Sequence, residues 1–322
     1  MKKIFFGREN YLDLLNRRVS GFRDSYRQNM AIIGDELVGK TSLIFRFMDT
    51  FNDNRIIFVF MDARLESVAS FSRRFIGVLL YNFLNNSGIP LKEDLDYLIL
   101  KADKFIPLTT EKIRVILRGV GKGKVIGVFP ELMALCESIH AETGKFSVVI
   151  FDEFQNLEEV GFKNFYRDWS KLLLTNKNTM YIILSSMKFK AKEILGKNLS
   201  LLFGNFEVIA VEPFDIEESC DYLIDRLQGL SLPEAYSDFI VNFTGGCPMY
   251  LDIIADRLLR DNGVSLSHAL EDILFDASGI LHQRFSNYMK RFSPPKSSRD
   301  YLPILYLISS GRNKIKDIAH LL

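Results

Sequence analysis

The sequence has little cysteine and almost no net charge, and each shortage excludes a class of protein. Its three cysteines, Cys136, Cys220 and Cys247, are too few and too scattered for a disulfide framework or a metal-ligand cluster. This usage is typical of a reducing compartment, so we expect a cytoplasmic protein. The formal net charge of +1 provides no overall field that would attract nucleic acid or a membrane surface, although a local basic patch is compatible with it.

Long apolar runs are also missing. No run approaches the roughly 18 apolar residues that a helix needs to cross a membrane, so we expect no membrane span. The first residues, MKKIFFGREN, contain a basic pair but only a short apolar run before Gly7, which argues against a signal peptide. With 48% hydrophobic and 25% charged residues, the composition is that of a globular protein, and 322 residues suit two or three domains.

The stretch GDELVGKTSL at residues 34–43 contains the full G-x-x-x-x-G-K-[ST] pattern of a phosphate loop. Its glycines let successive backbone N–H groups point at phosphates, Lys40 places a positive charge on the β- and γ-phosphates, and the Thr41 hydroxyl can ligate Mg²⁺. An apolar strand leads in at 29–33 and a helix leads out, as a phosphate loop requires. The residues predicted to bind nucleotide here are Gly34, Asp35, Glu36, Leu37, Val38, Gly39, Lys40, Thr41 and Ser42.

Two carboxylates end the apolar run VVIFDE at 148–153. Open α/β sheets bind ligands at the carboxyl ends of their strands, which is where these residues fall. We predict that Asp152 holds Mg²⁺ together with Thr41, and that Glu153 orients or deprotonates the attacking water.

Two serines, Ser185 and Ser186, end a later apolar run. Either hydroxyl can sense the γ-phosphate or position water, and either can simply satisfy the backbone at a strand end. We assign Ser186 to the catalytic set, with Glu153 and Lys40.

Apolar runs that suit buried strands alternate with helical patterns along the first two thirds of the chain. This alternation predicts an α/β fold of the P-loop NTPase kind, with a mostly parallel sheet flanked by helices. In RVILRGVGKGKVIGVF, two β-rich pieces flank glycines and lysines. We predict a hairpin insertion at about 114–128, whose basic tip at 119–124 is either a solvated turn or a contact to a partner or nucleic acid.

From about residue 213 the sequence is almost entirely helical in pattern. Asp215, followed three residues later by Glu218, predicts a capping box at the start of this region. The segment SPPKSS at 293–298 predicts a linker. We therefore expect an α/β domain at 1–212, a helical domain at 213–292 and a C-terminal module at 298–322.

Several of these segments recur in the same order in a known family. They are FGREN at 6–10, GDELVGKT, VVIFDEFQNL, ILSS, EVIAVEPF and TGGCPMYL. Together they resemble the archaeal ATPase branch of the STAND P-loop NTPases, which are relatives of AAA+ proteins and of the archaeal replication initiators. The resemblance extends over residues 3–322.

The resemblance implies further roles. Gly7 and Arg8 correspond to the segment beside the adenine, and Pro248 corresponds to a proline that approaches the nucleotide from an α-helical lid domain at 213–292. Residues 298–322 correspond to the start of a winged helix, of which the first two helices are recognisable, so this module looks truncated or vestigial. Without the resemblance, Gly7 with Arg8 would be an ordinary helix start, and Pro248 an ordinary proline in the first turn of a helix.

One position departs from the family pattern. Members often carry an arginine just before the strand that leads to the Pro-Phe turn, and the resemblance implies that it helps to sense the γ-phosphate. Asn205 stands there in this sequence. Asparagine does not neutralise phosphate charge, so the sequence supports nucleotide binding better than hydrolysis.

Three functions remain open at this point. The first is an ATP-binding molecular switch with slow Mg²⁺-dependent hydrolysis, in which ATP or ADP is held between the α/β domain and the helical lid. The second is a nucleic-acid-associated ATPase of the replication-initiator kind, which contacts DNA or a protein partner through its C-terminal module. The third is a scaffold that binds nucleotide without hydrolysing it. The phosphate-loop pattern also accepts GTP, whereas the resemblance favours an adenine nucleotide.

Overall fold

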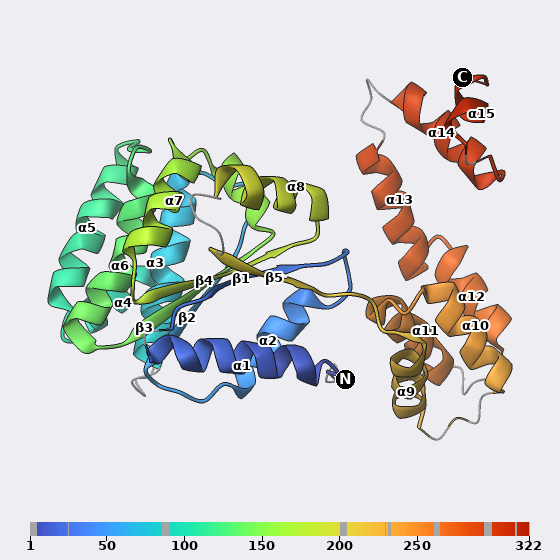
Figure 1. The fold of residues 1–322 in the computed structure, drawn as a ribbon, viewed down its shortest axis with the longest axis horizontal. Helices are drawn as coiled ribbons and strands as arrows, with labels where there is room; N and C mark the ends of the chain where they lie inside the picture. Colours follow the sequence, from blue (N-terminus) through green and yellow to red (C-terminus); the bar gives the residue numbers. More distant parts are fainter. Residues whose placement is uncertain are drawn as a thin grey trace. The chain divides into compact units, whose positions relative to one another are not determined.

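The chain divides into two compact units, Met1–Pro213 and Phe214–Leu322. In the computed structural model, residues 5–24, 26–85, 91–199, 205–228, 230, 233–260, 265–292, 298–312 and 314–321 are described. The division lies one residue beyond the predicted end of the α/β domain at residue 212. Figure 1 shows strands and helices in the first unit and helices in the second.

The described part of the first unit contains a five-stranded parallel sheet. Its strands lie in the order β2-β3-β4-β1-β5, and every neighbouring pair is parallel. They span Asn29–Ile33 (β1), Ile56–Asp62 (β2), Phe146–Asp152 (β3), Thr179–Ser185 (β4) and Phe206–Ala210 (β5). The predicted parallel sheet is therefore confirmed. Its central strands β1 and β4 are buried along their whole length, which explains why they read as continuous apolar runs.

Helices cover both faces of this sheet (Figure 1). The helices α1 (Glu9–Arg23) and α2 (Lys40–Thr50) share one hydrophobic core with one set of alternating strand residues. The opposite core contains the other set, together with four longer helices and the short α4. These helices span Val68–Asn85 (α3), Leu95–Ala102 (α4), Pro107–Gly121 (α5), Val128–Thr143 (α6) and Phe165–Thr175 (α7). Because side chains alternate across a strand, one sheet supports two separate cores.

Aromatic rings fill the larger core. The fully buried indole of Trp169 contacts Phe129 at a ring separation of 5.8 Å, and Phe129 contacts Phe165 at 4.8 Å. Such edge-to-face arrangements add to the gain from burial itself.

This packing yields a stability prediction. Phe129 is 1% exposed, so Phe129→Ala is expected to lower the free energy of unfolding by about 3–5 kcal/mol through a cavity and lost contacts. Urea unfolding followed by Trp169 fluorescence measures this change. Phe189, which is 92% exposed, offers a matched Phe→Ala control that should change stability by no more than about 0.5 kcal/mol. Equal effects of the two substitutions would contradict the assignment of this core.

The hairpin expected at about 114–128 is wrong. Helix α5 continues to Gly121, a short turn follows, and α6 begins at Val128. The residues Ile113, Ile116 and Val120 recur at helical spacing and are buried on one face of α5, and this periodicity outweighs the local strand propensity. Within the described part of this segment, the strand-like pairing is limited to a single bridge between Ile126 and Lys163.

The second unit is helical where it is described. Its helices span Ile216–Arg226 (α9), Glu234–Thr244 (α10), Pro248–Arg260 (α11), Leu266–Leu274 (α12), Ile280–Phe292 (α13), Ser298–Ser309 (α14) and Ile315–Ala319 (α15). The predicted capping box is confirmed, because the Asp215 carboxylate accepts from the Glu218 N–H at 2.8 Å and the Glu218 side chain accepts in return. Of the linker predicted at 293–298, residues 293–297 lie outside the described residues, and Ser298 begins α14. No described helix is both long enough and apolar enough to span a bilayer.

Candidate nucleotide-binding site

The candidate phosphate loop connects β1 to α2. Its two glycines are required for different reasons. A Cβ atom at Gly34 would lie 2.2 Å from the Val211 carbonyl oxygen, so only glycine fits there. Gly39 adopts a φ of 94° at the N-cap of α2, in the left-handed region that glycine favours. The loop thus ends where helix α2 presents its first backbone N–H groups, an arrangement that favours anions.

Lys40, the first residue of α2, is buried beneath this loop. Its ammonium donates to the Gly34 carbonyl at 3.0 Å and to the Asp35 carbonyl at 2.8 Å. Burial lowers the pKa of Lys40, and the nearby carboxylates of Glu153 and Asp152 oppose that shift. An ammonium group has three N–H donors, so two of them fix its position and the third is able to meet a phosphate oxygen.

Thr41 and Asp152 come together from two different elements. The Thr41 hydroxyl on α2 donates to Oδ2 of Asp152, the last residue of β3, at 2.7 Å. Burial raises the pKa of the Asp152 carboxyl, and the hydrogen bond from Thr41 opposes this. The described residues contain no group of three His, Cys, Asp or Glu side chains that could hold a metal ion. A hydroxyl and one carboxylate still suit Mg²⁺, which keeps several waters and takes further oxygens from phosphates.

Glu153 lies beside this pair and is held in place by Ser186. Its Oε2 accepts from the Ser186 N–H at 3.0 Å, from the Ser186 hydroxyl at 2.9 Å and from Gln155 Nε2 at 2.7 Å. Glu153 has a φ of 48°, an uncommon backbone conformation for a residue other than glycine. These contacts bring the predicted catalytic residues Glu153 and Ser186 together. The sequence analysis did not predict a role for Gln155, and the only signal there was its position two residues after Glu153. The structure shows that Gln155 is buried.

Ser185 has a different role from Ser186. Its carbonyl accepts from the Gly34 N–H at 3.2 Å, and its hydroxyl accepts from the Met187 N–H at 3.0 Å. Ser185 therefore satisfies the backbone where β4 ends, whereas Ser186 contacts the carboxylate of Glu153. The structure thus separates two neighbouring serines that the sequence left equivalent.

The segment of Gly7 and Arg8 also lies against the phosphate loop. Gly7 and Arg8 have φ values of 62° and 71°, just before α1 begins at Glu9. The Arg8 guanidinium is nearly buried and donates to the Val38 carbonyl at 3.4 Å and to the Glu212 carbonyl at 2.6 Å. The segment is therefore adjacent to the candidate site, as a role beside the adenine requires.

Pro248 belongs to the second unit, where it begins α11. In that unit, a Cβ atom at Gly246 would lie 2.0 Å from the Phe214 carbonyl oxygen, and the Phe214 N–H donates to the Gly246 carbonyl at 2.9 Å. The Gly-Gly-Cys-Pro segment therefore packs on the first residue of its own unit. The approach of Pro248 to a nucleotide stays a prediction.

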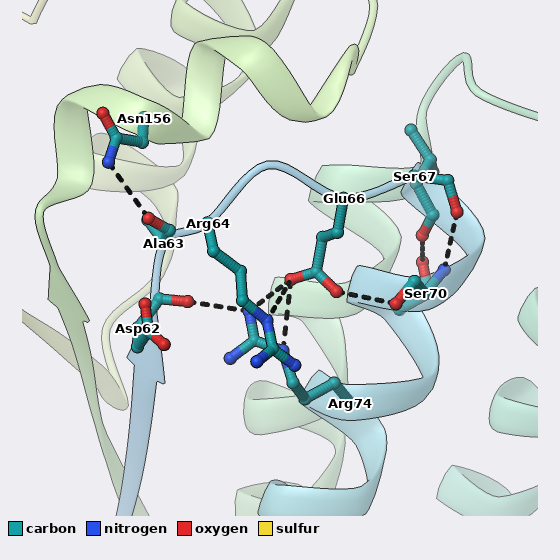
Figure 2. Close-up of polar contacts among 10 residues, drawn as sticks. Asp62, Ala63, Arg64, Glu66, Ser67, Ser70, Arg74 and Asn156 are labelled. Carbon is teal, nitrogen blue, oxygen red and sulfur yellow. Dashed lines mark hydrogen bonds and ion pairs between the residues drawn. The ribbon is translucent and has the colours of Figure 1, made fainter. Parts of the chain in front are cut away.

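The loop after β2 is anchored next to Asp152, a feature that the sequence did not indicate. The Ala63 N–H donates to the Asp152 carbonyl at 2.9 Å. Asn156 Nδ2 donates to the Ala63 carbonyl at 3.1 Å (Figure 2). Arg74 on helix α3 donates to the Asp62 carbonyl at 2.7 Å and forms an ion pair with Glu66 on the loop (Figure 2). The two Ala63 hydrogen bonds join the ends of β2 and β3, and the Arg74 contacts fix the loop on α3, so the backbone that carries Asp152 and Glu153 is held in place.

Asn205 does not belong to this site. It precedes the first residue of β5, and its carbonyl accepts from Asn29, the first residue of β1, at 3.1 Å. Because β1 and β5 are parallel, the phosphate loop lies at the other end of these strands, roughly 16 Å away at about 3.3 Å per residue. The expectation that position 205 senses the γ-phosphate bound to its own chain is therefore wrong, and Asn205 gives no reason to expect impaired hydrolysis there.

We compared the chain with protein families, curated proteins and solved structures. No protein-family model and no curated protein matches the chain. Among solved structures it is similar to a Walker-type ATPase of Pyrococcus abyssi, with a TM-score of 0.64 and 20% sequence identity over 98% of this chain and 83% of that one. The chain has the fold of a Walker-type ATPase. The P-loop ATPase fold implied by the sequence resemblance is thus confirmed.

Two further structures share this ATPase fold at lower identity. One is the ORC2 protein of Aeropyrum pernix in complexes with ADPNP and ADP, with a TM-score of 0.51 and 13% identity over 88% of this chain and 71% of that one. The other is the ORC1 protein of Aeropyrum pernix in complex with DNA, with a TM-score of 0.52 and 14% identity over 97% of this chain and 75% of that one. The similarity to these structures therefore extends along nearly the whole chain and includes the helical second unit.

Proposed function

We propose that this protein is an ATP-dependent molecular switch that binds adenine nucleotide with Mg²⁺ in its first unit and hydrolyses ATP slowly. The observation that carries the proposal is the connected set Lys40, Thr41, Asp152, Glu153 and Ser186 at the carboxyl edge of the sheet. The ends of two strands, β3 and β4, and the start of helix α2 supply these residues, and each residue makes a hydrogen bond within the set or to the phosphate loop.

Each residue has a distinct task in this proposal. The N–H groups of Gly34–Ser42 surround the phosphates, and Lys40 neutralises their charge. Thr41 and Asp152 hold Mg²⁺, which offsets the growing negative charge on the phosphate oxygens. Glu153 accepts a proton from the attacking water through Oε1, since Ser186 and Gln155 occupy Oε2. Ser186 couples the position of Glu153 to the presence of the γ-phosphate.

The switch itself involves the second unit. In the proposal, Gly7 and Arg8 lie beside the adenine, and Pro248 approaches the nucleotide from the helical lid. Occupancy of the site would then change the position of the lid and what the C-terminal helices can contact. The ADPNP and ADP complexes of the ORC2 protein support an adenine nucleotide as the ligand of this fold.

A direct test is to denature freshly purified protein and identify any released nucleotide by chromatography. Recovered ADP supports a switch that hydrolyses ATP and retains its product. Recovered ATP supports binding with very slow hydrolysis. If no nucleotide is released and titration with ATP or GTP gives no binding, the proposed function is wrong.

A second candidate function is an ATPase that acts on DNA. It is favoured by the ORC1 protein, whose structure is a complex with DNA, and by the charge of the C-terminal region. Between residues 284 and 316 the only acidic residue is Asp300, whereas the basic residues are Arg284, Lys290, Arg291, Lys296, Arg299, Arg312, Lys314 and Lys316. This basic segment contrasts with the near-neutral chain, and basic residues of this kind bind phosphate backbones.

The DNA candidate makes its own prediction. If the basic segment contacts phosphates, affinity for duplex DNA should fall by roughly 100–200-fold between 50 and 200 mM salt, for about four phosphate contacts. Fluorescence anisotropy of a labelled duplex measures this dependence. A variant with Arg312, Lys314 and Lys316 all replaced by glutamine should bind more weakly with a shallower salt dependence. No detectable binding at low salt would eliminate this candidate.

A further inference from the structure

The end of the first unit is packed directly on the phosphate loop. We call residues Val211, Glu212 and Pro213 the exit segment, because they follow β5 and lead to Phe214, where the second unit begins. The Val211 N–H donates to the carbonyl of Ile33 at 2.8 Å, immediately before the loop. The Val211 carbonyl lies where a Cβ of Gly34 would be. The backbones of the loop and of the exit segment are therefore in direct contact.

Two cations link the same two segments. The Lys188 ammonium lies 2.8 Å from Asp35 Oδ2 in the loop and 3.8 Å from Glu212 Oε2 in the exit segment. The Arg8 guanidinium donates to the Val38 carbonyl in the loop and to the Glu212 carbonyl in the exit segment. Glu212 is thus held through its side chain and its backbone by two residues that also contact the loop.

Lys188 is well placed to respond to the number of phosphates in the site. It begins α8 (Lys188–Glu193), two residues beyond Ser186, whose hydroxyl contacts Glu153. Its hydrogen bond to Asp35 raises the pKa of Lys188, so the side chain is charged at neutral pH. Asp35 carries a negative charge within the phosphate loop. A bound triphosphate would therefore compete with Asp35 for the ammonium of Lys188.

We propose that Lys188 couples nucleotide state to the connection between the two units: it pairs with Asp35 and Glu212 when no γ-phosphate is bound, and turns to the γ-phosphate when ATP is bound. This inference rests on the proposed function of the site. Release of Glu212 by Lys188 leaves the exit segment tied to the loop by fewer contacts. The exit segment is therefore held by fewer contacts when ATP is bound than when ADP is bound. This difference is the structural change that distinguishes the two states of the switch.

An ordinary surface ion pair would behave differently. Lys188 and Asp35 are both partly exposed, and pairs of this kind contribute little to folding stability. A merely structural role for Lys188 thus predicts similar nucleotide responses with and without the side chain. A coupling role predicts that the difference between the ATP and ADP states depends on it.

Amide hydrogen exchange of the full chain, read by mass spectrometry, tests the coupling. The reporters are the backbone amides of Val211 and Glu212 in the exit segment, measured with saturating ADP and with saturating ADPNP. In the wild type we expect exchange about threefold or more faster with ADPNP than with ADP, because local opening becomes easier. In Lys188→Ala this difference should disappear, and in Lys188→Arg, which keeps the charge, it should persist.

Lys192 provides the matched control, since it lies on the same helix, is exposed and makes no hydrogen bond or ion pair with the loop among the described contacts. Lys192→Ala should retain the wild-type difference. If the wild type and Lys188→Ala bind both nucleotides and show the same difference, the coupling role is wrong and the proposed function still stands. If the wild type binds neither nucleotide in the same titrations, both proposals are overturned.

Discussion

Lys40→Ala is expected to weaken ATP binding by about 30–150-fold, equivalent to roughly 2–3 kcal/mol for a lost charged hydrogen bond. Lys40 is 5% exposed, and its ammonium is positioned by two carbonyls of the loop, so little of its interaction with a phosphate would be screened by water. Isothermal titration of wild type and variant with ATP measures the change. The effect should be smaller for adenosine without phosphates, because Lys40 contacts only the phosphate loop.

Two controls separate a binding role of Lys40 from a folding role. Lys192→Ala removes an exposed lysine and should bind ATP as the wild type does. Urea unfolding followed by the fluorescence of Trp169, which is buried beside β3, reports whether Lys40→Ala leaves the first unit folded. A folded Lys40→Ala protein with unchanged ATP affinity would show that the nucleotide binds elsewhere or not at all.

Glu153→Gln is expected to lower the rate of ATP hydrolysis by about 10²–10⁴-fold, the usual contribution of a general base, with little change in ATP affinity. Glutamine has the same shape and its carbonyl oxygen can still accept from the N–H and hydroxyl of Ser186. It has no carboxylate that takes a proton from water. Phosphate release under single-turnover conditions separates this loss from any change in binding.

Glu159→Gln is the matched control for this substitution. Glu159 lies on the same short 3₁₀ segment, Phe154–Val160, and is exposed. It should hydrolyse ATP at the wild-type rate. Equal rates for wild type and Glu153→Gln would assign the proton transfer to another group, whereas absence of turnover in every variant and in the wild type would support a switch that only binds.

The capping box and the parallel strands illustrate what local pattern is able to predict. Asp215 and Glu218 act on backbone groups three residues away, so their contact depends on local geometry that the sequence specifies directly. The apolar strands are buried on both faces and therefore carry a strong signal whatever their neighbours are. The segment around α5 shows the limit, because β-branched residues and glycines there suggested a hairpin while the spacing of the buried residues required a helix.

The sequence by itself determined the phosphate loop, the carboxylates at the end of β3 and the α/β fold, since each depends on short spacings or on composition along one element. The tertiary structure alone decided which serine faces Glu153, at which edge of the sheet Asn205 lies, and that Lys188 and Arg8 bridge the loop and the exit segment. These contacts join residues 33 to 204 positions apart in the chain. Strand order and register set such distances, and no local pattern encodes them.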